Sequence, residues 1–208
     1  METTILLPIP IKTPRLLIRP LQPGDGKALY TAARESQDEF EEFMPWASDT
    51  TASPDAAENF AQQASINWVL KISSEPWLQL LILCRETNAI LGIANFHHIE
   101  WDVPCVEIGY WLSSQKTGKG FMTETINALT RYAIEMFHAR RIEIRCDITN
   151  VKSQGVPRRL GYALEATLKS NRLDHLTGEP SDTLIYVRHN AENLPPLEVS
   201  WPGKKSDS

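Results

Sequence analysis

Residues 106–123, VEIGYWLSSQKTGKGFMT, constrain the fold of this chain more than any other stretch. Their first half, VEIGYWL, is rich in aromatic and β-branched residues and predicts a strand. Their second half places two glycines and two lysines directly ahead of a long helical pattern. A strand, a glycine-rich turn and a helix N-terminus suit a phosphate, because the N–H groups of the turn and the helix dipole both attract an anion. We therefore expect this stretch to hold the pyrophosphate of a nucleotide cofactor.

The overall composition excludes several classes of protein. The 208 residues suffice for one domain with a substantial core, and 42% of them are hydrophobic and 23% charged, as in ordinary globular proteins. The net charge of −5 gives no support for direct nucleic-acid binding, and no stretch reaches the ~20 apolar residues of a membrane span. Cys84, Cys105 and Cys146 are far apart, so we expect no metal site. Their odd number without a secretory signal predicts a cytoplasmic protein.

Helical and strand patterns alternate along the chain. Two apolar runs separated by Glu-Thr-Asn predict an antiparallel hairpin ahead of the central stretch, which excludes a Rossmann domain and favours a mixed α/β (α+β) fold. We expect a lead-in over residues 1–12, one folded domain over residues 13–190 and a loose tail over residues 191–208. Strands are predicted over residues 14–21, 77–85, 89–98, 106–112, 139–148, 162–168 and 181–188, and helices start near residues 25, 53, 118 and 150.

Several motifs together resemble the GNAT superfamily of N-acetyltransferases. Residues 115–120, QKTGKG, match Q/R-x-x-G-x-G/A, the acyl-CoA pyrophosphate loop of that superfamily. The strand EIGYWL precedes the loop, and NVKS at residues 150–153 and RRLGY at residues 158–162 follow it, as in the family. In the N-terminal half, PRLLIRPL, MPW and LGIANF are similar to the RimJ/RimL branch, the ribosomal-protein N-terminal acetyltransferases. The resemblance covers roughly residues 12–190 and implies a single domain whose mostly antiparallel sheet of about seven strands is flanked by helices.

The resemblance implies an acetyl-CoA-dependent enzyme that transfers acetyl directly to a primary amine, with the N-terminal α-amine of a ribosomal protein as the leading acceptor. In the family, the strand before the loop splays from its neighbour, and its free backbone groups pair with the pantetheine arm. The loop grips the pyrophosphate, where lysines add positive charge and Thr123 can donate to an oxygen. The expected cofactor-binding residues are Tyr110, Trp111, Leu112, Gln115, Lys116, Thr117, Gly118, Lys119, Gly120, Phe121, Met122, Thr123, Asn150 and Ser153.

Two residues are candidates for catalytic proton transfer. Ser153 has the position at which this branch uses a hydroxyl to protonate the departing CoA thiolate, and it would serve equally as a helix N-cap. Glu107 lies on the strand beside the cofactor and would take the proton of the amine through a water, or else be a surface carboxylate. Asn150 would hydrogen-bond the pantetheine. No feature indicates an acyl-enzyme, since Cys146 alternates with isoleucines as a buried strand residue does.

One position departs from the family pattern. Some RimL-type relatives carry a carboxylate where this chain has Arg172, with Asp174 and His175 close by. This departure leaves open a CoA-binding regulatory protein without turnover. His97 and His98 end the third predicted strand near the expected acceptor and are weaker candidates for the base.

The sequence leaves the acceptor and the oligomeric state open. An acetyltransferase of small amines, such as a polyamine, an amino acid or an aminoglycoside, would need an acidic cleft, which the DEFEE cluster at residues 38–42 could supply. The aromatic segment at residues 40–46 offers a contact for a homodimer. The expected partners are acetyl-CoA and an amine acceptor, with no nucleic acid and no membrane.

Overall fold

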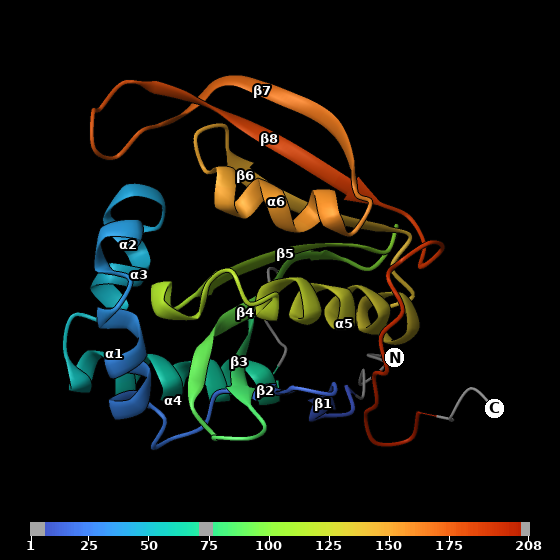
Figure 1. Ribbon diagram of the computed structural model, residues 1–208, viewed down its shortest axis with the longest axis horizontal. Coiled ribbons are helices and arrows are strands. Elements are labelled where there is room, and N and C mark those ends of the chain that lie inside the picture. Colours follow the sequence, from blue (N-terminus) through green and yellow to red (C-terminus); the bar gives the residue numbers. More distant parts are fainter. Residues whose placement is uncertain (1–6, 71–76, 205–208) are drawn as a thin grey trace.

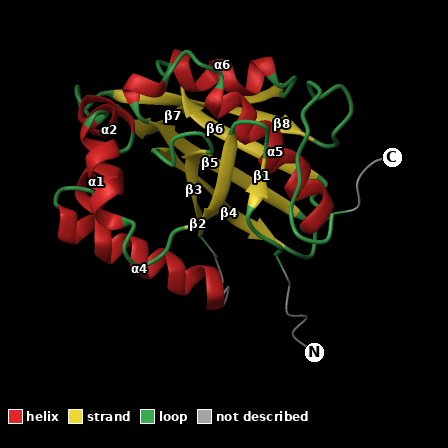
Figure 2. Ribbon diagram, turned by 60° about the horizontal axis from the view of Figure 1, so that its bottom comes forward, coloured by secondary structure: helices red, strands yellow, loops and turns green. Residues whose placement is uncertain are grey.

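The computed structural model describes residues 7–70 and 77–204, which form one eight-stranded sheet with helices on both faces (Figure 1, Figure 2). The strand order is β1-β2-β3-β4-β5-β6-β8-β7, so the last strand of the chain lies inside the sheet and β7 forms an edge. This mixed α/β architecture is the predicted one, with one strand more than expected. The strands are β1 Ile11–Lys12, β2 Leu16–Pro20, β3 Leu78–Cys84, β4 Ile90–Glu100, β5 Cys105–Leu112, β6 Arg141–Asp147, β7 Ala163–Leu173 and β8 Pro180–Arg188.

The pairing of β5 with β6 is the feature that positions the site. Among the strands of the described residues it is the one parallel pairing, and it joins only Cys105–Glu107 to Arg141–Glu143. Beyond it, β5 pairs with β4 as far as Leu112, while β6 pairs with β8 as far as Asp147. The two strands therefore separate like a fork, which confirms the splaying implied by the family resemblance.

Both faces of the sheet are covered because β3 sends apolar side chains to each in alternation. Leu80 and Ile82 join the core beneath α5, whereas Leu81 and Leu83 join the core beneath α1 to α4. Helix α6 follows β6 and packs on α5. The helices are α1 Gly26–Arg34, α2 Gln37–Phe43, α3 Pro45–Thr50, α4 Pro54–Leu70, α5 Phe121–Met136 and α6 Val151–Arg159, with a 3-10 turn, η1, at Ser114–Lys116.

Both described ends of the chain differ from the loose packing expected of them. The lead-in contributes β1, and its Ile11 is fully buried. In the tail, Ser200 pairs with Lys12 through two backbone hydrogen bonds of 2.8 and 2.9 Å. The Trp201 ring contacts the Tyr132 ring edge-to-face at 5.0 Å. The sequence did not predict this packing because the apolar residues are isolated among prolines and their packing partners are remote in the chain.

The aromatic segment at residues 40–46 packs against the sheet of its own chain and lines a cavity. It includes the second half of α2 and the start of α3, and Phe40 is fully buried with its ring 5.0 Å from that of Trp111. Its remaining aromatic side chains face the cavity described below. In the described residues, no helix combines the length and the apolar character needed to cross a membrane.

Candidate active site

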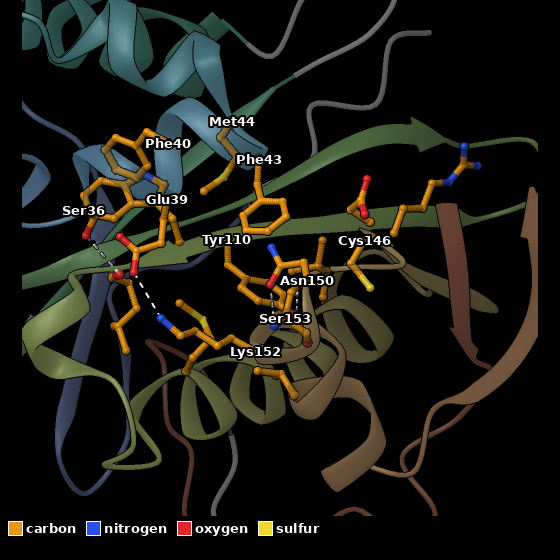
Figure 3. A pocket seen from close by; sticks show the side chains of 18 of the residues that line it. Ser36, Glu39, Phe40, Phe43, Met44, Tyr110, Cys146, Asn150, Lys152 and Ser153 are labelled. Atoms are coloured by element: carbon orange, nitrogen blue, oxygen red, sulfur yellow. Dashed lines mark hydrogen bonds and ion pairs between the residues drawn. The ribbon is translucent and has the colours of Figure 1, made fainter. Parts of the chain in front are cut away.

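The fork between β5 and β6 opens a cavity of about 1330 Å³. Its walls come from the separated parts of both strands, from α2 and the first turn of α3, and from the N-terminal turns of α5 and α6. In Figure 3, Tyr110 of β5 lies beside Asn150 and Ser153 at the start of α6, with Phe43 and Met44 opposite them. An unpaired strand edge and two helix N-termini therefore border the same cavity.

The glycine loop is held in a left-handed backbone conformation. Gly118 and Gly120 have φ values of 74° and 77°, and Gly120 is the N-cap of α5. Arg15, which lies between β1 and β2, holds the loop in place. Its Nη1 donates to the Lys119 carbonyl at 2.9 Å, its Nε lies 2.5 Å from Glu124 Oε2, and its guanidinium stacks 4.6 Å from the centre of the Phe121 ring.

The cavity includes most of the residues expected to bind the cofactor. Gln115, Lys116 and Lys119 do not line it, and Lys116 instead lines a shallower depression beside α1. Thr123 lines it, and its hydroxyl oxygen accepts a hydrogen bond of 3.0 Å from Arg159 Nε. The expected residues that line the cavity are Glu107, Tyr110, Trp111, Leu112, Thr117, Gly118, Gly120, Phe121, Met122, Thr123, Asn150 and Ser153.

A hydrogen-bonded group of three residues spans the fork. Asn150 Oδ1 accepts from the Ser153 backbone N–H at 2.9 Å, so Asn150 is the N-cap of α6 and the alternative of Ser153 as the cap is wrong. The Tyr110 hydroxyl donates to the Ser153 carbonyl at 3.0 Å and accepts from Ser153 Oγ at 3.3 Å. Burial raises the pKa of Tyr110, which keeps this hydroxyl protonated. The sequence did not identify Tyr110 as a second hydroxyl beside Ser153.

Glu107 lies inside the cavity, and its side chain is only 12% exposed, so it is not a surface carboxylate. Its Oε1 is 3.3 Å from His97 Nε2, and its Oε2 is 3.2 Å from Arg145 Nε. His97 and His98 lie within β4 rather than at its end, because this strand continues to Glu100. Ligand atoms of His97, His98 and Glu107 all lie within 4.8 Å of one another, so these residues could hold a metal ion, in contrast to the expectation from the cysteines.

Arg172 of β7 also faces the cavity, and it is paired with a carboxylate of β6, which lies on the other side of β8 in the sheet. Its Nε lies 3.3 Å from Asp147 Oδ2, and its Nη2 approaches the Phe43 carbonyl at 3.5 Å. Burial alone would raise the pKa of Asp147, but hydrogen bonds from Thr149 and the charge of Arg172 lower it. Asp174 instead accepts two backbone N–H groups in the turn before β8, away from the cavity.

Two other sets of residues complete the walls. Cys146 is buried and burial raises its pKa to about 11, so it stays a thiol and the expectation that it is not a nucleophile agrees with its surroundings. On α2, Asp38, Glu39 and Glu42 line the opposite wall. Of these, Glu39 pairs with Lys152 of α6 at 3.1 Å (Figure 3). Glu39 also accepts from Ser114 Oγ at 2.8 Å, so it joins α2 both to α6 and to the loop.

Comparison with known families identifies the class of protein. The family described as "Acetyltransferase (GNAT) domain" matches residues 15–163, well over half of the chain. The chain belongs to this family and is an N-acetyltransferase. Arg172 therefore does not indicate a protein without turnover.

Within the family, the chain is similar to the RimJ/RimL-like branch. It is 27% identical over 142 residues to the ribosomal-protein-serine acetyltransferase of Escherichia coli (strain K12), covering 61% of this chain and 78% of that one. YdaF of Bacillus subtilis (strain 168), whose ribosomal N-acetyltransferase assignment is itself provisional, is 23% identical over 190 residues, covering 91% and 95%.

Solved structures show the same fold. The microcin C7 self-immunity acetyltransferase MccE, solved with acetyl-CoA and AMP, has a TM-score of 0.75 at 24% identity and covers 85% of this chain and 93% of its own. RimL, a ribosomal alpha-N-protein acetyltransferase solved with coenzyme A, has a TM-score of 0.73 at 24% identity and covers 90% and 98%.

Proposed function

We propose that this enzyme transfers the acetyl group of acetyl-CoA to the N-terminal α-amine of a protein, with a ribosomal protein as the leading acceptor. The observation that carries the proposal is the fork between β5 and β6, which ends at the left-handed glycine loop. An unpaired strand edge suits the amide-bearing pantetheine arm, and positive-φ glycines beside the α5 N-terminus suit its pyrophosphate. Similarity to the ribosomal-protein-serine acetyltransferase supports the choice of acceptor.

In this reaction, the amine nitrogen attacks the thioester carbonyl, so a C–N bond forms, the C–S bond breaks and the thiol sulfur leaves with the electron pair. Glu107 would accept the proton lost by the amine, through a water, because its carboxylate reaches the cavity. Ser153 Oγ, which is hydrogen-bonded to the Tyr110 hydroxyl, would protonate the leaving thiolate. An α-amino group has a pKa of about 8, so a weak base suffices.

We assign the two ends of β5 to different substrates. Glu107 lies five residues before Leu112, so these positions are about 16 Å apart along the strand. We assign the end near Leu112, with Gly118, Gly120 and Thr123, to the pyrophosphate of CoA. The end near Glu107 then receives the acceptor, and the residues of the α6 N-terminus lie between the two ends of the cavity.

A small cationic amine is the second candidate acceptor. Asp38, Glu39 and Glu42 of α2 all line the cavity, and Glu39 is the member of this set with a lysine partner described above. Carboxylates on one wall favour a positively charged acceptor such as a polyamine. Measuring acetyl transfer to both kinds of amine distinguishes the two acceptors.

A matched pair of glycine variants tests the proposal. Gly118 and Gly178 have φ values of 74° and 73°, and a Cβ added at either would meet no atom within 4 Å. Gly118→Val and Gly178→Val therefore carry the same backbone strain, of about 1–2 kcal/mol, but only Gly118 lies in the cavity. We expect Gly118→Val to weaken CoA binding by about 10–100-fold, because each charged hydrogen bond lost costs about 1.5–3 kcal/mol.

Titration calorimetry gives the CoA affinity, and release of free thiol from acetyl-CoA gives the turnover. The acceptor panel contains peptides beginning with serine or alanine, a polyamine and an aminoglycoside. Equal CoA affinity of the two glycine variants would mean that the cofactor lies elsewhere. Absence of thiol release with every acceptor, despite tight CoA binding, would refute acetyl transfer to amines of these classes.

A further inference from the structure

We propose that His97, His98 and Glu107 form a binding site for a divalent transition-metal ion of the Zn²⁺ class, at the acceptor end of the cavity. Their potential ligand atoms lie within 4.8 Å of one another. Two of the residues face each other across the β4–β5 ladder, where His97 pairs with Glu107, and His98 is the next residue along β4. The site is separate from the glycine loop, which lies beyond the other end of β5.

A chain of hydrogen bonds leaves the Nε2 atom of His97 free to be a ligand. The Gly109 backbone N–H, a certain donor, lies 3.2 Å from Asn95 Oδ1, which identifies that atom as an oxygen. Asn95 Nδ2 in turn donates to Gln79 Oε1. His97 Nδ1 lies 2.8 Å from the same Asn95 oxygen and must therefore carry the hydrogen. In the neutral ring the lone pair is then on Nε2, on the side of Glu107, and a histidine that ligates a metal has this kind of outer partner.

The distance between the two best-placed ligand atoms fits a metal ion. His97 Nε2 and Glu107 Oε1 are 3.3 Å apart. Two ligands bound at about 2.0–2.1 Å to a tetrahedral zinc ion stand about 3.3–3.4 Å apart. The pair therefore already has the separation that a zinc ion requires.

The surrounding residues hold His97 in this position. A Cβ on Gly109 would come within 2.8 Å of Asn95 Oδ1 and 3.2 Å of His97 Cε1, so only glycine leaves room for the arrangement. On its other side, the ring of Trp77 lies 5.6 Å from that of His97. A ligand that is fixed before the ion arrives loses little freedom when it binds.

His98 would supply the third ligand of the ion, and the fourth position would remain open. His98 is exposed and lies at an irregularity in the β4–β5 pairing, with φ at 47°, so its ring can turn toward the ion. Arg145 Nε contacts the second oxygen of Glu107 and orients the carboxylate from outside. The fourth position would open into the cavity. Two imidazoles and one carboxylate favour zinc, nickel, cobalt or copper over magnesium or calcium.

The consequence for catalysis rests on the proposed function. An ion bound to Glu107 would occupy the lone pairs with which this residue accepts the proton of the amine. Metal binding should therefore inhibit acetyl transfer, and a chelator should restore it.

Binding is tested first, without any assay of activity. Tag-free protein, with Cys84 and Cys105 replaced by serine, is titrated with Co²⁺ and followed by visible absorption, and with Zn²⁺ followed by calorimetry. We expect one ion per chain, with the intense absorption of a four-coordinate cobalt site. Asn95→Ala removes the outer partner of His97 and should weaken metal binding by about 10–100-fold. His97→Ala and His98→Ala each remove a ligand and should weaken metal binding by more than that factor. His175→Ala, an exposed histidine on the turn before β8, should have no effect.

Each outcome decides the proposal. Zn²⁺ affinity that is the same in His97→Ala, His98→Ala and His175→Ala would overturn it, provided that thermal melting shows all three variants to be folded. Absence of cobalt absorption would overturn it as well. If the ion binds as expected but no acceptor is ever acetylated, the metal site stands and the proposed function fails.

Discussion

The ion pair between Asp147 and Arg172 should stabilise the fold at the floor of the cavity. Arg172, on β7, contacts the carboxylate of Asp147 at the end of β6 and the last carbonyl of α2. We expect a double-mutant cycle of Asp147→Asn, Arg172→Gln and the double variant to give a favourable coupling free energy. Asparagine keeps the oxygen that accepts from the Thr149 N–H, so the cycle isolates the charge interaction.

The expected magnitude follows from distance and burial. Unit charges 3.3 Å apart interact by about 5 kcal/mol at an effective dielectric constant of 20, before any cost of desolvation. The side chain of Asp147 is 4% exposed and that of Arg172 is 26% exposed. The pair thus lies between exposed pairs, worth about 0.2–1 kcal/mol, and fully buried pairs, whose disruption costs about 3–5 kcal/mol. We expect a coupling of about 1–3 kcal/mol.

Urea unfolding at about pH 7 and at about pH 3 provides the measurement. Asp147 has a lowered pKa in the folded state, so its stabilisation is present above the unfolded pKa and is lost as the pH falls through the folded one. The coupling should therefore shrink at low pH. As a control, Lys169→Gln breaks the pair of Lys169 with Asp182, in which the lysine is 74% exposed, and should cost no more than about 0.5 kcal/mol. A coupling near zero at pH 7, or one that does not change with pH, would refute the reasoning.

Two further predictions concern single side chains. Glu107→Gln should lower kcat/KM for acetyl transfer by about 10²–10⁴-fold without changing the affinity for acetyl-CoA, and full activity would remove Glu107 from the reaction. The cysteines should differ in alkylation at about pH 8, measured by peptide mass spectrometry. Cys84 should react first, because hydrogen bonds from Thr87 lower its pKa, whereas buried Cys146, with a pKa of about 11, should react only after unfolding. Equal alkylation rates in the folded protein would contradict this.

The local parts of the site could be predicted from the sequence because their signals are local. The loop from Gln115 to Gly120 depends on two glycines that need positive φ, and both have it. The hydrophobic spacing of the following helix is equally a property of adjacent residues, and α5 has Ile126, Leu129 and Ala133 buried. The antiparallel hairpin of β3 and β4 follows from two apolar runs and a short turn.

The parts that could not be predicted depend on contacts between distant residues. Arg15 meets Glu124 across 109 positions of the chain, so nothing near either residue indicates that they hold the glycine loop together. The same is true of Arg172, whose place in the pattern indicated a missing carboxylate, whereas the fold gives it Asp147 as its partner. The histidines at positions 97 and 98 become a possible metal site only through the register that sets them opposite Glu107.

The width of the fork has its own structural cause. A free strand edge inside a sheet would ordinarily form hydrogen bonds with the adjacent strand, because unpaired backbone N–H and C=O groups are costly when buried. Here Tyr110 reaches from β5 to α6, and its two hydrogen bonds with Ser153 keep the helix start against the open edge. The side chain that spans the gap thus also presents its hydroxyl beside Ser153, where the thiolate would leave. The contact that holds α6 against the open edge is therefore the same one that would position the proposed proton donor, so closing the fork would require breaking it.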